Sequence, residues 1–176
     1  MSKIQMRFAG TGGQGMMLIG DLMAYALGMK EDKEIVLLKS YGPEARGGAC
    51  RSELIADDEK ISYPAITTPT FLLSMSQQSY DSYTEDADEK TVILVDSELV
   101  SNLDQKYSFT YRIPLTYLAK EKCGKAICAN IVALGAICKI TRLVSKDKMI
   151  EVLKEKLNPK ILELNLQAFE VGWEAV

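Results

Sequence analysis

Residues 10–15 read GTGGQG, and residues 40–48 read SYGPEARGG. The first stretch holds four of the chain's 12 glycines and the second holds three. A glycine inside a helix or strand costs roughly 0.5–1 kcal/mol relative to alanine, so glycine clusters mark places where the backbone turns sharply or approaches another group. GTGGQG lies between a strand pattern (residues 4–9) and a helical pattern (residues 16–27). This strand–loop–helix order predicts an α/β fold.

Strand and helix patterns alternate along most of the chain. The predicted strands are residues 4–9, 35–38, 49–56, 71–75, 91–96 and 107–113, and the predicted helices are residues 16–27, 76–86, 115–122, 130–140, 146–156 and 159–176. This order predicts a doubly wound, Rossmann-like, mostly parallel sheet with helices on both faces and a helical C-terminal end. We expect the apolar run 35–38 to be covered on both faces, and the alternating run 49–56 to lie nearer an edge.

The composition is that of an ordinary globular chain. With 47% hydrophobic and 26% charged residues, the 176 residues predict one domain, residues 1–176. The net charge is −3 and the basic residues are scattered, which argues against a nucleic-acid partner. The N-terminus lacks the apolar core of a secretory signal, and the apolar runs are too short or too interrupted for a membrane span. We therefore expect a cytoplasmic protein.

The chain has four cysteines and no histidine. The cysteines form no C-x-x-C pair, so the usual zinc and iron–sulfur spacings are missing and we expect no metal site; buried free thiols in a reducing compartment are the simpler interpretation. Without an imidazole, Ser-His-Asp and Cys-His catalysis within this chain are excluded. We therefore assign no catalytic residue.

The first glycine loop matches G-x-G-x-x-G in the context that binds dinucleotides. Such a loop directs backbone N–H groups and the positive end of a helix dipole at one spot, where a phosphate is the expected anion. An NAD site needs an acidic residue after the second strand, where this chain has Lys39 and Ser40, and no Gly-Lys-Ser/Thr of a P-loop follows. A tight turn without a ligand remains the alternative.

The second glycine loop places Arg46 between turn residues and a following strand. A guanidinium flanked by glycines can approach a phosphate or carboxylate with little obstruction. Since loops after parallel strands gather at the carboxyl edge of a sheet, both glycine loops are expected to line one crevice. Alternatively, Arg46 is an ordinary surface ion-pair partner.

Four stretches together resemble a known family: GTGGQGMMLIGDLMAYA (10–26), SYGPEARGGACRSELIADDEKISYP (40–64), LLSMSQQSYDSY (72–83) and NIVALGAI (130–137). They look like the gamma subunit of 2-oxoacid:acceptor (ferredoxin) oxidoreductases, over residues 3 to 140. The arginine loop is most like that of the 2-oxoglutarate branch. A pyruvate or branched-chain 2-oxoacid oxidoreductase is the alternative within the family.

The resemblance implies a subunit that is inactive alone. It implies alpha, beta and delta partners, with thiamine diphosphate, Mg and [4Fe-4S] clusters on partner subunits, and ferredoxin, flavodoxin or a quinone-linked carrier as acceptor. In such a heterotetramer the gamma subunit covers the active site and helps to position coenzyme A, which receives the succinyl group. The residues implied to bind coenzyme A are Thr11, Gly12, Gly13, Gln14, Gly15, Ser40, Tyr41, Gly42, Arg46 and Asn130. Asn130 is a weaker candidate because a helix N-cap explains it as well.

Two interpretations outside this one remain open from the sequence. A free-standing Rossmann-type protein would bind a nicotinamide or flavin nucleotide alone, as a monomer or homodimer. A purely structural subunit would pack its glycine loops against a neighbour without touching a ligand. Exposed apolar surface on the isolated chain, seen as aggregation or a homodimer, would favour either subunit interpretation over the free-standing one.

Overall fold

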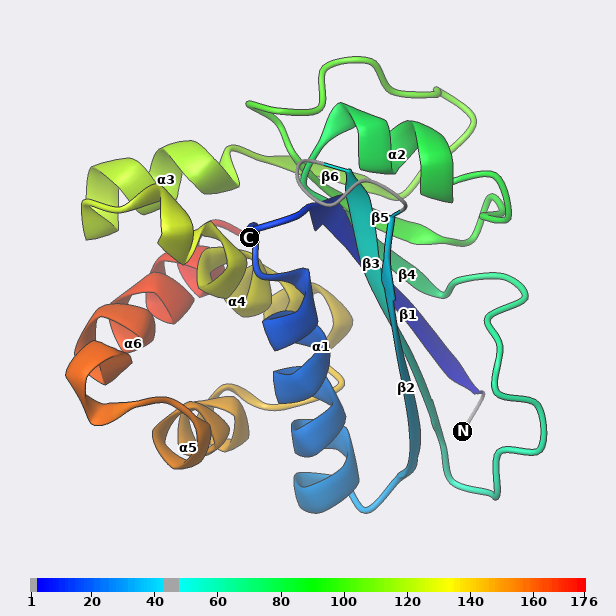
Figure 1. The fold of residues 1–176 in the computed structure, drawn as a ribbon, viewed down its shortest axis with the longest axis horizontal. Coiled ribbons are helices and arrows are strands. Elements are labelled where there is room, and N and C mark those ends of the chain that lie inside the picture. Colours follow the sequence, from blue (N-terminus) through cyan, green and yellow to red (C-terminus); the bar gives the residue numbers. More distant parts are fainter. Residues whose placement is uncertain (1–2, 43–47) are drawn as a thin grey trace.

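The computed structural model describes residues 3–42 and 48–176. Within that part, six strands form one mixed sheet in the order β2-β3-β1-β4-β5-β6 (Figure 1). The pairs β1–β4, β4–β5 and β5–β6 are parallel, whereas β3 runs antiparallel to both β1 and β2. All described strands except β3 therefore run in the same direction, and the predicted α/β fold with a mostly parallel sheet is confirmed. The strand bounds are β1 Ile4–Thr11, β2 Glu34–Tyr41, β3 Ala49–Asp57, β4 Phe71–Ser74, β5 Val92–Asp96 and β6 Thr110–Ile113.

The order of β2 and β3 corrects two expectations. We expected residues 49–56 near an edge, but β3 lies inside the sheet, between β2 and β1. The charged residues that made this strand look half exposed include Glu53, which is buried and accepts a hydrogen bond from Arg7 of β1 at 2.8 Å. We expected residues 35–38 to be covered on both faces, but β2 is the edge strand and Leu38 is 41% exposed.

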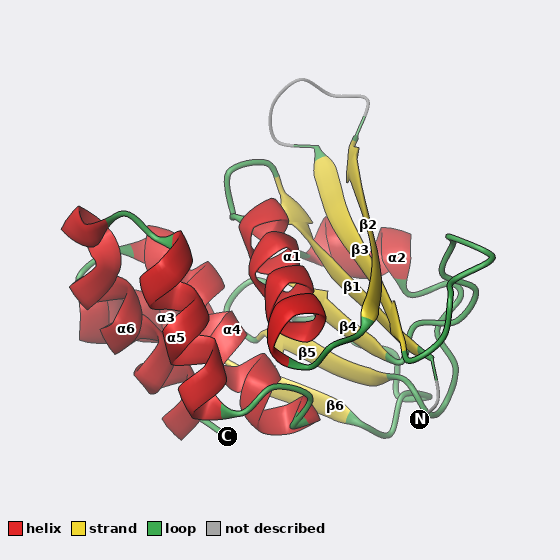
Figure 2. Cartoon of the chain, turned by 90° about the horizontal axis from the view of Figure 1, so that it is seen from below, coloured by secondary structure: helices red, strands yellow, loops and turns green. Residues whose placement is uncertain are grey.

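Helices cover both faces of the sheet, as predicted. Figure 2 shows α2 on one side and α1 with α3–α6 on the other. The helix bounds are α1 Met16–Tyr25, α2 Gln77–Tyr83, α3 Leu115–Cys123, α4 Ala129–Thr141, α5 Lys146–Lys156 and α6 Pro159–Glu174. The first helix ends earlier than predicted because the chain continues as a π-helical turn, Ala26–Lys30. The second is shorter than predicted and begins at a capping box, in which Ser76 accepts from the N–H of Ser79.

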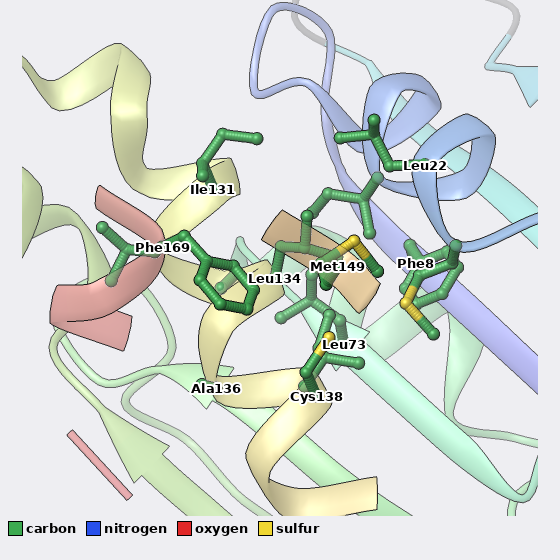
Figure 3. Close-up of a cluster of buried hydrophobic side chains, with 14 of the residues drawn as sticks. Phe8, Leu22, Leu73, Ile131, Leu134, Ala136, Cys138, Met149 and Phe169 are labelled. Carbon is green, nitrogen blue, oxygen red and sulfur yellow. The ribbon is translucent and has the colours of Figure 1, made fainter. Parts of the chain in front are cut away.

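The larger hydrophobic core lies between the sheet and the layer of α1 and α3–α6. Phe8 of β1 and Leu73 of β4 meet Leu134 of α4, Met149 of α5 and Phe169 of α6 there (Figure 3). A smaller core, which includes Leu72 and Tyr80, lies under α2. Among the described residues, no helix is both long and apolar enough to cross a membrane. The larger core includes residues of both β1 and α1, so it holds the two elements on either side of their connecting loop in place.

Candidate functional site

The two glycine stretches meet at one edge of the sheet. The last residue of β1, Thr11, pairs with Ala49 of β3, and the N–H of Gly12 donates to the carbonyl of Gly48 at 3.2 Å. β2 runs in the same direction as β1, so its end at Tyr41 reaches the same edge. The predicted proximity of the two loops therefore holds for their described ends. Arg46 lies outside the described residues.

The loop between β1 and α1 depends on glycine at two positions. Gly13 has φ of +92° and Gly15 has φ of +80°, in the left-handed region that other residues rarely adopt. Gly15 is the N-cap of α1 and offers no side-chain oxygen, so no described side chain caps this helix. The first bond into the helix runs from Ile19 N–H to the Gly15 carbonyl. The amides before Ile19 at this helix start therefore make no bond within the helix, which is the arrangement found at anion-binding helix starts.

Gln14 braces this loop from within. Its Oε1 accepts from the N–H of Thr11 at 2.7 Å, and its Nε2 donates to the carbonyl of Met75, just after β4, at 2.9 Å. A Cβ on Gly10 would lie 2.5 Å from this Oε1. Gln14 therefore ties the ends of β1 and β4 together. It also lines the cavity described below, so its predicted contact with a ligand stays a prediction.

Asn130 of α4 packs against Gly15 at the start of α1. Its side chain is so close that a Cβ on Gly15 would lie 2.2 Å from its Nδ2, and its Oδ1 accepts from the N–H of Ile131. Residue 130 is not the N-cap that we weighed, because α4 begins one residue earlier and Cys128 is its cap. Asn130 was a predicted site residue, but its contact with Gly15 could not be predicted because the two residues are far apart in the sequence.

A cavity of about 240 Å³ opens beside the glycine loop. It lies at the carboxyl ends of β1 and β4, where the chain connections leave in opposite directions, the position at which open α/β sheets bind ligands. Much of its wall is apolar, and its lining includes Gly13, Gln14, Met75, Leu99, Thr116 and Ile127. The cavity can therefore take an apolar group more readily than a bare phosphate.

Thr116, which lines this cavity, was missed by the sequence analysis. Its N–H and its hydroxyl both donate to Oδ2 of Asp96, at 2.9 and 2.5 Å. Asp96 is fully buried at the end of β5 and also accepts from the N–H of Glu98. An acidic residue that ends a strand on the predicted site edge was the signal available in the sequence.

The remaining predicted residues lie farther along the same edge. Ser40 and Tyr41 are exposed at the end of β2, and Tyr41 is 73% exposed. Gly42 packs tightly, since a Cβ there would lie 2.6 Å from the carbonyl oxygen of Ala49. Neither Ser40 nor Tyr41 lines the cavity beside the glycine loop.

A second arginine, Arg51, lies on β3 and pairs with Ser40 of β2. The Arg51 guanidinium is 4.9 Å from the ring centre of Tyr83, and its buried Nε lies 3.5 Å from Oε2 of Glu53 in an ion pair. Arg7 lies on the same face and binds Asp86 and Glu53. Burial alone would raise the pKa of Asp86, but hydrogen bonding to Arg7 and its charge outweigh burial and lower that pKa.

The cysteine thiols are buried and spread over the fold. Burial raises the pKa of Cys50, Cys123 and Cys128, and it raises that of Cys138 to about 12. No group of three or more metal-ligating side chains is assembled within residues 3–42 and 48–176. These thiols are therefore protonated at neutral pH.

Comparisons with known proteins agree with this architecture. The family model described as pyruvate ferredoxin/flavodoxin oxidoreductase matches residues 5–175. The chain is 41% identical to 2-oxoglutarate synthase subunit KorC of Methanocaldococcus jannaschii, over 97% of this chain and 92% of that one. It is 29% identical to ketoisovalerate oxidoreductase subunit VorA of Methanothermobacter thermautotrophicus, over 98% of this chain and 36% of that one.

Solved structures give the same result. A keto/oxoacid ferredoxin oxidoreductase gamma subunit from Geobacter sulfurreducens matches with a TM-score of 0.90 and 38% identity, over 99% of this chain and 97% of that one. A 2-oxoglutarate:ferredoxin oxidoreductase from Magnetococcus marinus, with 2-oxoglutarate, coenzyme A and succinyl-CoA bound, matches with a TM-score of 0.88 and 26% identity, over 99% of this chain and 31% of that one. The predicted resemblance is confirmed. The chain belongs to the pyruvate ferredoxin/flavodoxin oxidoreductase family and is a gamma-type subunit of a 2-oxoacid:ferredoxin oxidoreductase.

Proposed function

We propose that this chain is the gamma subunit of a thiamine-diphosphate-dependent 2-oxoglutarate:acceptor oxidoreductase that forms succinyl-CoA. Its own task is to help position coenzyme A and to cover the active site of its partners. The observation that carries this proposal is the cavity beside an uncapped helix start, at the sheet edge where both glycine loops end. The identity to 2-oxoglutarate synthase subunits supports the choice of 2-oxoacid.

The glycine loop is suited to the anionic part of the coenzyme. The free amides at the start of α1 and the positive end of its dipole favour a phosphate oxygen, and the family resemblance adds Arg46 as a counter-charge. Thr11 and Gly12 hold the loop against β3, and Gln14 holds it against β4. The Asn130 side chain packs against Gly15.

The same edge leaves Ser40, Tyr41 and Gly42 next to the arginine loop. Two of these side chains are exposed at the end of β2, where an incoming ligand or a partner subunit can reach them. We propose that Ser40 and Tyr41 contact the coenzyme or the partner that covers it. Gly42, which has no side chain, lets the backbone of β2 lie close to Ala49 of β3.

The chemistry itself belongs to the partners. Thiamine diphosphate, with Mg, supplies the carbanion chemistry of 2-oxoacid decarboxylation, and [4Fe-4S] clusters on other subunits carry the electrons toward ferredoxin, flavodoxin or a quinone-linked acceptor. The gamma chain binds the nucleotide end of coenzyme A and so orients the thiol toward the reacting carbon. Binding energy from a remote part of a substrate then lowers the barrier by orientation.

We further propose that residues 1–176 act as one domain of a cytoplasmic alpha–beta–gamma–delta assembly. The four free cysteines support a reducing compartment. The subunit names of the relatives support an assembly of several chains.

The test begins with the assembly that co-purifies with this chain under native conditions. Dye reduction by this assembly should require both 2-oxoglutarate and coenzyme A. Turnover of pyruvate or a branched-chain 2-oxoacid in place of 2-oxoglutarate would keep the family and overturn the branch. A lone chain that binds a nicotinamide or flavin nucleotide would instead support the free-standing interpretation.

Gly13 lies three residues before the first residue of α1 and allows a matched test of the anion proposed at that helix start. A Cβ at residue 13 meets no atom within 4 Å, and both Asn and Asp tolerate positive φ better than other side chains. Gly13→Asp should raise the KM for coenzyme A about tenfold above that of Gly13→Asn, because only Asp adds a charge that repels a phosphate. Equal KM values for the two variants would argue against an anion at this loop. Arg46→Ala should raise the same KM while leaving assembly intact.

A further inference from the structure

The cavity beside the glycine loop offers its ligand few polar contacts. Gln14 already uses its oxygen on Thr11 and its nitrogen on the carbonyl of Met75. Met75, Leu99 and Ile127 contribute apolar wall. A ligand segment that fills this space is therefore mostly aliphatic.

Thr116 adds one polar group of defined character. Its hydroxyl hydrogen points at Oδ2 of Asp96, which already accepts the Thr116 N–H. Asp96 is fully buried, and its carboxylate acts only as a hydrogen-bond acceptor. The Thr116 hydroxyl must therefore donate its hydrogen to Asp96. The hydroxyl lone pairs are left for the cavity. A ligand group that meets Thr116 must therefore donate a hydrogen bond.

Gly13 supplies the complementary polarity. It lines the same cavity, and its N–H has no partner among the described residues. An acceptor at Thr116 and a donor at Gly13, in an otherwise apolar wall, match a secondary amide on an aliphatic arm. A phosphate, which has only acceptors near neutral pH, does not match the acceptor at Thr116.

Volume points the same way. About 240 Å³ is below the roughly 300–1,000 Å³ of pockets that enclose a whole drug-sized ligand, so the cavity holds one segment of a coenzyme and not all of it. We propose that this cavity binds the amide-bearing aliphatic arm of coenzyme A, the pantetheine segment, with Thr116 accepting from an amide N–H and Asp96 positioning Thr116. This assignment rests on the proposed function, and it separates the arm from the phosphates at the start of α1.

The test uses the purified assembly and two partial ligands as competitive inhibitors against coenzyme A. Pantetheine carries the amide arm without phosphates, and adenosine 3′,5′-bisphosphate carries the nucleotide end without the arm. Thr116→Val keeps the side-chain shape and removes the acceptor, whereas Thr116→Ser keeps the hydroxyl. Thr116→Val should weaken inhibition by pantetheine about fivefold, the factor that one ordinary hydrogen bond contributes, and change inhibition by the bisphosphate less than twofold. Thr116→Ser should restore pantetheine inhibition to within twofold of wild type.

A second pair of variants guards against a folding defect at Thr116. Ile127 lines the cavity and is 63% exposed, and Ile161 on α6 is 47% exposed without lining it. Ile127→Ser should weaken pantetheine inhibition several-fold, and Ile161→Ser should leave it unchanged. Both are surface side chains, so thermal denaturation of either variant should stay close to wild type.

The outcomes separate this assignment from the proposed function. Turnover that requires coenzyme A, with pantetheine inhibition unchanged in both Thr116→Val and Ile127→Ser, would overturn the assignment alone. A larger loss of bisphosphate inhibition than of pantetheine inhibition would place the phosphates in the cavity and overturn it as well. A wild-type assembly that oxidises 2-oxoacids without any dependence on coenzyme A would overturn both.

Discussion

The contact between α4 and α6 gives the sharpest prediction for stability. Gly172 of α6 faces Val132 of α4, and a Cβ at residue 172 would lie 1.7 Å from the carbonyl oxygen of Val132. Gly135 of α4 makes the reciprocal approach, since its Cβ would lie 2.1 Å from the carbonyl oxygen of Phe169. The two helix backbones therefore touch at paired glycines. Gly172→Ala should push them apart.

Two opposing effects set the magnitude. Replacing glycine by alanine inside a helix gains about 1 kcal/mol from helix propensity. Restoring an ordinary Cβ contact of 3.4 Å requires α6 to move by roughly 1.7 Å away from a backbone atom that cannot rotate aside. Overpacking of this kind costs about 3 kcal/mol or more. The net loss is about 2 kcal/mol or more, which for a chain of this length lowers Tm by about 4–8 °C.

Urea denaturation of the isolated chain, followed by circular dichroism, measures this loss. Glu163→Ala on the exposed side of α6 is the control and should change the unfolding free energy by less than about 0.5 kcal/mol. A Gly172→Ala variant as stable as wild type, or more stable, would show that helix propensity prevails. The inference that the backbones of α4 and α6 touch at Gly135 and Gly172 would then be refuted.

Three further predictions concern ionisation and capping. Asp86→Asn should destabilise the chain fully above about pH 5, and less as the pH falls below about 4, because the pKa lowered by Arg7 stabilises only the ionised carboxylate; urea midpoints across pH 3–7 measure this. Cys138, whose pKa is raised to about 12 by burial, should be alkylated by iodoacetamide only as fast as the chain unfolds, as mass spectrometry over time would show. Asn158→Ala removes the side-chain cap on Lys160 N–H and should cost about 1 kcal/mol in thermal denaturation.

Local signals in the sequence were sufficient for the β1–loop–α1 unit and for the helical end. Helical periodicity and start signals predicted α5 with its observed bounds, and the proline at position 159 correctly marked the start of α6. The glycine pattern of residues 10–15 also fixed the loop correctly, because positive φ at Gly13 and Gly15 is a backbone requirement that only a few residue types meet. These features depend on neighbours close in sequence.

Features set by partners distant in sequence escaped prediction. Glu53 looked like a solvent-facing residue of an edge strand, but Arg7, 46 positions away, binds it inside the sheet. A charged residue that is paired inside the sheet therefore made an interior strand look like an exposed one in the sequence. The reversed direction of β3 follows from the hairpin with β2, which nothing in the strand pattern itself distinguishes from a parallel crossover.

The candidate site shows the same limit more sharply. The predicted residues Gln14 and Asn130 do lie at the loop, but the sequence did not show that Gln14 binds the backbone of Thr11 and Met75 or that Asn130 packs against Gly15. Thr116 and Asp96 were missed because a threonine in the first turn of a helix and an aspartate at the end of a strand are common, and their pairing appears only in the hydrogen bond between them. The glycine motifs were enough to predict which edge of the sheet carries the site. The hydrogen bonds between side chains at that edge, which determine what it can bind, were not predictable from the motifs.

This pairing also explains how a chain without histidine can take part in an acyl transfer. Side-chain polar groups at the cavity are used internally, Gln14 on the backbone and Thr116 on Asp96, so neither is free to exchange protons with a substrate. What remains for a ligand is backbone N–H groups and one fixed acceptor, which bind and orient but transfer no proton. Changes at this site should therefore appear first in the KM for coenzyme A. They should reach kcat only when the thiol no longer meets the carbon held by the partner subunits.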